Sequence, residues 1–218
     1  MKRIVGVGTT AMLVGMLAAP AVAQQIVLQP EIGINFAKVS DLGLSAGESS
    51  SSRTGFAAGM AVLFGLSQQF SVGVGGYYSQ QGVKIKDSSG EGTIKLDYIQ
   101  VPLTLGISFP TGSSVTPSIF AGPMLGFKSS CKVSAEGVSA NCDDPNVDIA
   151  VKSTDFGILF GGGLGIRAGT GMFVVNAYYD LGLTDINDSP SQTSEQKPKN
   201  RMFGFGVGYA FPLGGGGM

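Results

Sequence analysis

The side chains that most often carry catalysis are sparse in this chain of 218 residues. It contains no histidine, which removes the usual general base of hydrolases and transferases. An enzyme that uses only carboxylates remains open in principle, but no paired-carboxylate motif stands out in the sequence. We therefore expect no catalytic residue, no cofactor and no enzymatic activity.

Two cysteines, Cys131 and Cys142, lie in one polar segment. Because the N-terminal sequence indicates export to an oxidising compartment, we expect a disulfide between them, with two free thiols as the alternative. Two cysteines without a histidine do not make the usual zinc site. Asp143, Asp144 and Asp148 follow closely, but their spacing matches no EF-hand, so a solvated acidic loop is favoured over a calcium site. We predict no metal site.

The N-terminus has the pattern of a secretory signal peptide over residues 1–23. It has a basic start at residues 2–3, an apolar stretch over residues 4–18 and the small-residue cleavage site Ala21-Val22-Ala23. The alternative is a transmembrane anchor, which the cleavage site and the polar residues 24–25 argue against. Removal of the two basic residues changes the formal charge from −1 to −3, because the segment contains no acid. That mild acidity predicts no nucleic-acid partner.

The stretch 202–211 alternates large apolar side chains with small ones, which places the two kinds on opposite faces of a strand. One face carries Phe203, Phe205, Val207, Tyr209 and Phe211, and the other carries Met202, Gly204, Gly206, Gly208 and Ala210. A large-apolar face backed by a small-residue face is typical of a strand with lipid outside and a crowded lumen inside. The same alternation predicts seven further strands, near 26–39, 54–66, 69–85, 93–109, 115–129, 154–168 and 171–183.

The connections between these strands alternate in length. Tight turns near 67–68, 110–114 and 168–171 alternate with longer polar loops near 40–53, 86–92, 130–153 and 184–200. The sequence therefore predicts an all-β, eight-stranded antiparallel up-and-down transmembrane β-barrel over residues 24–213, followed by a flexible Gly-rich tail over 214–218. A soluble lipocalin-like barrel is the alternative, which the absence of tryptophan and the 35 glycines disfavour. Two polar stretches, 49–52 and 189–199, are expected to be mobile surface.

Polar residues on the inward-facing positions are the remaining candidates for a site. They are Glu31, Asn35, Gln100, Thr104, Arg167, Asn176 and Asp180. The favoured interpretation is a structural polar network that fills a narrow lumen, and the alternative is a narrow gated conduit. Glu31 starts the first strand and Arg167 ends the sixth, so we expect them to lie at the same end and to pair across the lumen. Tyr78 and Tyr179 face outward and suit an interfacial aromatic girdle.

The chain resembles the eight-stranded outer-membrane barrels, specifically the PorT-like outer membrane protein beta-barrel domain family, itself similar to OmpA-like and OmpX-like barrels. The similar stretches span nearly the whole mature chain. They are 33–36 (GINF), 96–103 (LDYIQVPL), 121–123 (AGP), 155–157 (DFG), 179–183 (YDLGL) and 200–201 (NR). The resemblance implies an outer-membrane location after cleavage at Ala23, contact with outer-membrane lipid, and a monomer.

The C-terminal strand also resembles the signal that the barrel-assembly machinery reads during insertion. Gly206, Tyr209 and Phe211 match its glycine and two aromatics. The chain departs from the pattern at Gly204, where a polar residue is usual, and it continues to Met218 beyond the last aromatic. The resemblance implies little chemistry. We therefore predict a structural or surface-interaction role through the exposed loops, with a narrow pore or a secretion-system component as the alternative.

Overall fold

The computed structural model describes residues 25–88, 90–135, 137–142, 144, 147, 149–188 and 197–213. The predicted signal peptide and the predicted Gly-rich tail lie outside the described residues. The strands are β1 (Ile26–Ser40), β2 (Ser49–Gly65), β3 (Phe70–Lys86), β4 (Glu91–Ser108), β5 (Val115–Ala135), β6 (Val138–Asn141), β7 (Thr154–Ala168), β8 (Gly171–Gly182) and β9 (Lys199–Leu213). No helix of the described chain has the length and apolar character to cross a membrane.

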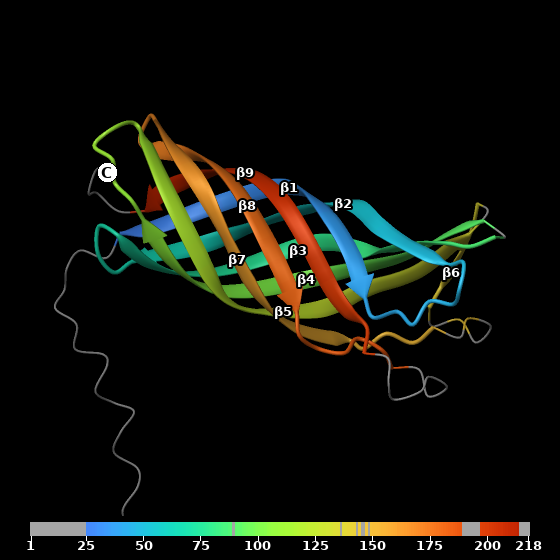
Figure 1. Ribbon diagram of the computed structural model, residues 1–218. Helices are drawn as coiled ribbons and strands as arrows, with labels where there is room; N and C mark the ends of the chain where they lie inside the picture. The colour runs from blue at the N-terminus through green and yellow to red at the C-terminus, as the bar shows by residue number, and fades with distance from the viewer. Residues whose placement is uncertain are drawn as a thin grey trace, which may run out of the picture.

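Eight of these strands close into an antiparallel barrel. The sheet runs β4-β3-β2-β1-β9-β8-β7-β5, and β4 pairs with β5 to complete the circle (Figure 1). The last strand closes the barrel against the first, with Ile26 opposite Leu213 and Ser40 opposite Lys199. The prediction of an eight-stranded up-and-down barrel is confirmed, and β6 is a short additional strand that pairs only with β5.

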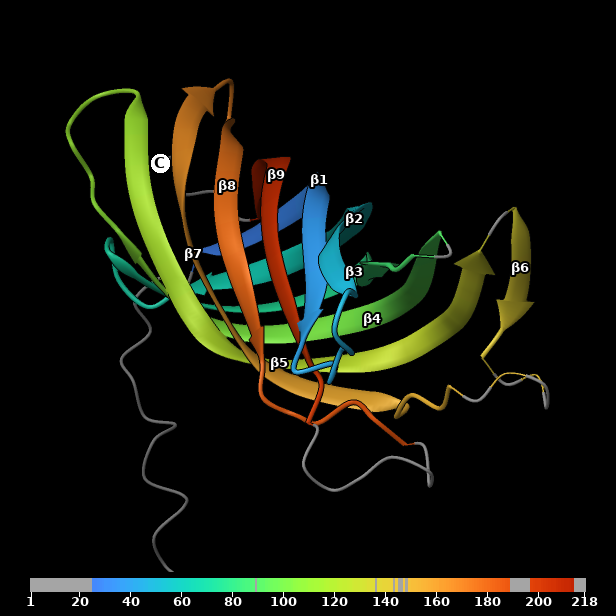
Figure 2. The ribbon, with the colours of Figure 1, turned by 45° about the vertical axis from the view of Figure 1, so that its right-hand side comes forward.

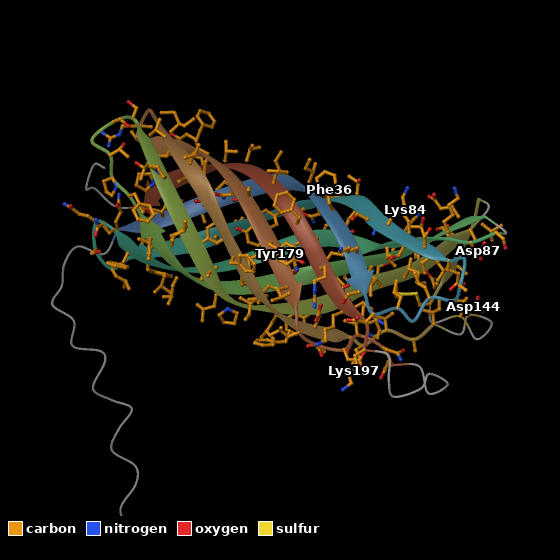
Figure 3. All side chains as sticks on the ribbon, in the orientation of Figure 1. Phe36, Lys84, Asp87, Asp144, Tyr179 and Lys197 are labelled. Atoms are coloured by element: carbon orange, nitrogen blue, oxygen red, sulfur yellow. A yellow bond between two sulfur atoms is a disulfide. The ribbon has the colours of Figure 1, made fainter. Side chains whose placement is uncertain are left out.

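The alternation read from the sequence separates the outside of the barrel wall from the inside. On β9, Phe203 and Val207 are 40% and 52% exposed, whereas Met202 is 2% exposed. The outward apolar side chains form a belt around the barrel, and Phe36 and Tyr179 lie on this outer side (Figure 3). β8 has 12 residues. At about 3.3 Å per residue and a tilt of about 45°, such a strand spans about 28 Å, close to the hydrocarbon thickness of a bilayer.

Several strands run farther toward the long loops than the sequence predicts. Residues 49–52 were expected to be mobile surface, and this is wrong because they pair with residues 83–86 of β3. The first residues of the predicted loop 130–153 are the end of β5. The chain then turns back, and β6 pairs with this part of β5. Of the other predicted mobile stretch, residues 189–196 lie outside the described residues and Lys199 begins β9.

We call the extension formed by residues 49–52, 83–86, 91–96, 131–135 and 138–141 the projecting sheet. Its strands continue β2, β3, β4 and β5 beyond the rest of the wall (Figure 2). The barrel therefore has a short-turn end, which carries both described chain ends, and a loop end, which carries the projecting sheet (Figure 1).

Inward glycines allow neighbouring strands to approach closely. A Cβ atom at Gly122 of β5 would overlap the carbonyl oxygen of Leu103 and lie 3.0 Å from the Cα of Thr104. The neighbour here is backbone, which cannot rotate away as a flexible side chain can. Gly76 of β3 faces outward, and a Cβ there meets nothing within 4 Å.

We expect Gly122→Ala to lower the free energy of unfolding by about 1–3 kcal/mol, because the added methyl group overpacks the wall between β4 and β5. Gly76→Ala is the matched control and should leave stability nearly unchanged. The temperature midpoint of heat-modifiable gel migration in detergent measures both. Equal midpoints for the two variants would contradict the close approach at Gly122.

Candidate functional site

Glu31 is the centre of a polar cluster in the half of the lumen near the short turns. Its Oε2 atom accepts hydrogen bonds from Nε2 of Gln29 at 3.0 Å and from Nδ2 of Asn176 at 2.8 Å. Gly206 and Gly163 make room for this cluster. A Cβ at Gly206 would overlap Oε1 of Glu31, and one at Gly163 would overlap Oδ1 of Asn176. The small inner face seen in the sequence is therefore the space that these polar side chains occupy.

A second polar cluster lies one step nearer the loop end. The Tyr178 hydroxyl donates to Oδ1 of Asn35 at 2.9 Å, and Nδ2 of Asn35 donates to the Ser79 hydroxyl at 3.0 Å. Asn35 and Ser79 are fully buried. A Cβ at Gly204 would lie 2.5 Å from the Tyr178 ring, so a bare backbone is required beneath this tyrosine.

A third cluster contains two buried acids. Nε2 of Gln100 donates to Oδ2 of Asp180 at 2.8 Å. Nδ2 of Asn200 donates to Oδ2 of Asp155 at 2.8 Å and to the Tyr98 hydroxyl at 3.2 Å. The other carboxylate oxygen of each acid is buried and has no hydrogen-bond partner among the described residues. Asn35, Gln100, Asn176 and Asp180, predicted as lumen polar residues, thus bond inside the barrel, whereas Asp155 and Asn200 were missed as lumen residues.

Arg167 does not join the interior. The side chain is exposed at the short-turn rim, where Pro110, Thr111 and Ser114 surround it. No ion pair between Arg167 and Glu31 occurs within the described residues, so the predicted pairing is wrong. Arg167 does occupy an inward-facing position of the strand alternation, as predicted. However, it is opposite Met172, next to the turn between β7 and β8. A long cationic side chain at that position reaches water more easily than it enters the lumen.

The half of the lumen near the short turns is not completely filled. A cavity of about 170 Å³ is lined by Glu31 together with apolar and small residues, among them Ala61, Leu63, Met124, Phe120 and Thr104. The sequence was interpreted as a lumen filled by side chains, and this is wrong for this half. Glycine and alanine dominate the inner faces of β2 and β3, and the bulky neighbours Leu63 and Tyr77, which pack over some of these glycines, fill only part of the volume that they leave.

The loop end is closed by an apolar cluster. Val39, Val83, Leu96, Cys131 and Ile186 are buried against one another. The segments 149–152 and 184–188 cover this cluster and pair with each other. The Lys152 amide donates to the Ile186 carbonyl at 2.8 Å, and Asp188 donates to Ala150 at 3.0 Å. The sequence did not lead us to expect this closure, although a period-two run of apolar residues at 83, 85, 94 and 96 is a signal that indicates it.

The disulfide between Cys131 and Cys142 is present and belongs to this cluster. Cys131 lies in β5 rather than in a loop, and Cys142 follows β6, so the bond fastens the β5–β6 hairpin. The Cys142 amide also donates to the Cys131 carbonyl at 3.1 Å. Asp143 and Asp148 lie outside the described residues. No group of metal-binding side chains is found within the part of the chain that the structure describes.

The outer face of the projecting sheet carries four lysines, Lys84, Lys86, Lys95 and Lys132, which we call the lysine face. Lys95 is directly opposite Lys132 on the neighbouring strand. Lys84 forms an ion pair with Glu91 at 3.2 Å and is labelled in Figure 3. Like charges directly opposite each other destabilise a sheet, so this arrangement favours an anionic partner. Sequence patterning had not singled out these lysines.

The residues of the predicted insertion signal all lie in β9. Gly206 faces inward against Glu31, whereas Tyr209 and Phe211 face outward with ring centroids 4.5 Å apart. The Tyr209 hydroxyl donates to the Ala168 carbonyl at 2.6 Å, which fixes the ring beside the β7–β8 turn. The role of these residues in recognition by the assembly machinery stays a prediction.

We expect Asn176→Leu to lower the free energy of unfolding by about 1–3 kcal/mol, because it removes a donor from the partly buried Glu31 carboxylate. Arg167→Gln is the matched comparison and should leave the melting midpoint unchanged, since Arg167 is at the exposed rim. Thermal melting in detergent, followed by circular dichroism, measures both variants. A midpoint that falls in Arg167→Gln as far as in Asn176→Leu would restore the rejected ion pair.

Comparison with solved structures supports the barrel architecture. OprG, an outer membrane protein from Pseudomonas aeruginosa, is similar at 12% identity with a TM-score of 0.57, over 87% of this chain and 95% of that chain. Neisserial surface protein A is similar at 15% identity with a TM-score of 0.51, over 85% of this chain and 97% of that chain. At these identities the likeness concerns the fold alone.

A comparison with curated proteins gives no match. The model of the family described as outer membrane protein beta-barrel domain matches residues 22–188, which is most of the sequence. This match agrees with the closed barrel, the outward apolar belt and the short-turn and loop ends described above. The chain therefore belongs to the outer membrane protein beta-barrel domain family, and its place is the outer membrane.

Proposed function

We propose that this barrel is a non-catalytic surface-interaction protein, and that its lysine face binds the phosphate groups of lipid headgroups in the outer leaflet. The observation that carries the proposal is the direct opposition of Lys95 and Lys132. Two ammonium groups held side by side on a rigid sheet repel each other, and a bridging phosphate converts that repulsion into two charge-assisted hydrogen bonds.

The position of the lysine face favours a lipid headgroup as the source of that phosphate. On β4 the outward positions pass from Ile99, in the apolar belt, through Asp97 to Lys95. The Tyr78 hydroxyl donates to Asp97 at 2.8 Å, and the Tyr78 ring packs against Phe56. Aromatic rings of this kind gather at the membrane–water interface. The lysines therefore continue the lipid-facing surface at the height where headgroups begin.

The interior supports a closed barrel rather than the narrow pore that the sequence left as an alternative. From the third polar cluster to the loop end, the lumen passes through buried side chains and then through the apolar cluster around Val83 and Leu96. The finer assignment to a PorT-like secretion component stays a prediction, as does the monomeric state. The absence of histidine remains the argument against catalysis.

We expect the double variant Lys95→Gln/Lys132→Gln to bind lipid A, a bisphosphorylated glycolipid, about tenfold more weakly than the parent, because two charge-assisted contacts are lost. The measurement is native mass spectrometry of the detergent-solubilised protein titrated with lipid A. Lys197→Gln is the control, since Lys197 is an exposed lysine away from the lysine face (Figure 3). Equal retention of lipid A by the double variant and the control would refute the proposal.

Planar-bilayer recording addresses the closed interior separately. We expect the purified barrel to show no discrete conductance steps above those of a protein-free detergent control, because buried side chains block the path to the loop end. Regular conductance steps that disappear when the protein is heat-denatured would show that the barrel is a pore and would contradict the surface-interaction proposal.

A further inference from the structure

The cavity in the short-turn half of the barrel has one ionisable acid and no base among its lining residues. That acid is Glu31, and most of the surrounding groups are apolar or small, including Ala57, Ala61, Leu63, Phe120, Leu159 and Val174. A carboxylate in such surroundings is stable only with a compensating donor or a positive charge. The lining therefore has a single carboxyl group among mainly apolar or small side chains.

The partners of Glu31 within the barrel satisfy only part of its carboxylate. The two hydrogen bonds that it accepts from described residues, from Gln29 and Asn176, both end on Oε2. Oε1 lies over the bare backbone of Gly206. The ion pairs of the described chain are Arg53–Asp97, Lys84–Glu91 and Lys152–Asp185, so no lysine or arginine there neutralises Glu31.

Two tyrosine rings line the same cavity as the carboxylate. Tyr77 packs over Gly59 and Gly75, and Tyr178 stands over Gly204. The face of an aromatic ring attracts a cation, and the attraction is stronger where water is displaced. A carboxylate flanked by aromatic rings is the chemistry that recognises an ammonium group.

The cavity reaches the short-turn end of the barrel. Its lining includes Ser71, Ser108 and Ser118, all within a few residues of the short turns. At its other end it stops at Met124 and Met202, both buried beside the polar clusters. A ligand would therefore enter from the short-turn end, opposite the projecting sheet.

We propose that this cavity is a binding site for a small primary amine with an apolar body, whose ammonium group contacts Oε1 of Glu31. The volume of about 170 Å³ sets the size of that body. A dry cavity of about 150 Å³ accommodates benzene, so a single ring or a short branched alkyl group fits here. The amine would lie between Glu31 and the two tyrosines, with its apolar part against Ala61, Leu63 and Leu159. This site is independent of the lysine face.

Benzylamine is the probe, and benzyl alcohol is its neutral match in size and shape. Isothermal titration into the barrel in lipid nanodiscs avoids competition from detergent tails. We expect benzylamine to bind at least about tenfold more tightly than benzyl alcohol. Glu31→Gln keeps the acceptor for Asn176 but removes the charge, so it should bring benzylamine down to the affinity of benzyl alcohol. Ala61→Leu fills the cavity and should abolish the binding of both.

The comparison in the unaltered protein keeps the proposal testable even if a variant fails to fold. Heat-modifiable migration first establishes that each variant forms a barrel. Equal affinity for benzylamine and benzyl alcohol, no binding of benzylamine, or full affinity in Glu31→Gln would each overturn the amine site. Persistence of benzylamine binding in a folded Ala61→Leu barrel would place the amine elsewhere and overturn it as well.

Discussion

The backbone hydrogen bonds between β1 and β9 are the constraint on which the rest of this structure depends. In lipid an unpaired strand edge has no water to satisfy it, so a sheet crosses a membrane only when its first and last strands meet. Here they meet over thirteen rungs, from Ile26–Leu213 to Ser40–Lys199. Closure fixes the curvature of the wall, and the curvature in turn requires bare backbone at positions such as Gly33 and Gly122, where a Cβ would overlap a neighbouring strand.

Closure of the barrel also explains how polar side chains fit into the interior and form hydrogen bonds there. Eight strands enclose a lumen scarcely wider than two facing side chains. Large inward groups are accommodated beside glycines of a neighbouring strand, as Tyr178 is by Gly204 and Glu31 is by Gly206. Amide side chains then bridge the acids, with Asn176 on Glu31 and Gln100 on Asp180. The glycines on the inner face of β9 are therefore the counterpart of polar residues on other strands.

Period-two alternation predicted all eight barrel strands, because burial in lipid and burial in the lumen impose opposite side-chain sizes on every strand. It predicted less at the ends. Strand β2 begins at Ser49 rather than near residue 54, since a serine run has no apolar alternation and pairs only because β3 continues beside it. Arg167 has inward parity, but its place next to a turn lets the side chain reach water. The cavity around Glu31 depends on which small residues face one another across the lumen, and a one-dimensional pattern does not contain that information.

The two ends of the barrel are stabilised by different interactions. The two proposed binding surfaces, the lysine face and the cavity around Glu31, are therefore independent of each other. At the loop end, the disulfide and the cluster around Leu96 make the projecting sheet a small folded unit with its own apolar core. That unit holds Lys95 and Lys132 opposite each other, and this arrangement does not depend on contacts within the lumen. At the short-turn end, the wall encloses a cavity with one acid, Glu31. The partner that the sequence predicted for this acid, Arg167, lies in solvent instead. Between the cavity and the loop end, the second and third polar clusters are hydrogen-bonded between strands that are not neighbours in the sheet, so they form a rigid barrier rather than a path. A ligand in the cavity therefore has no direct contact with the lysine face, and occupancy of one surface should leave the affinity of the other unchanged.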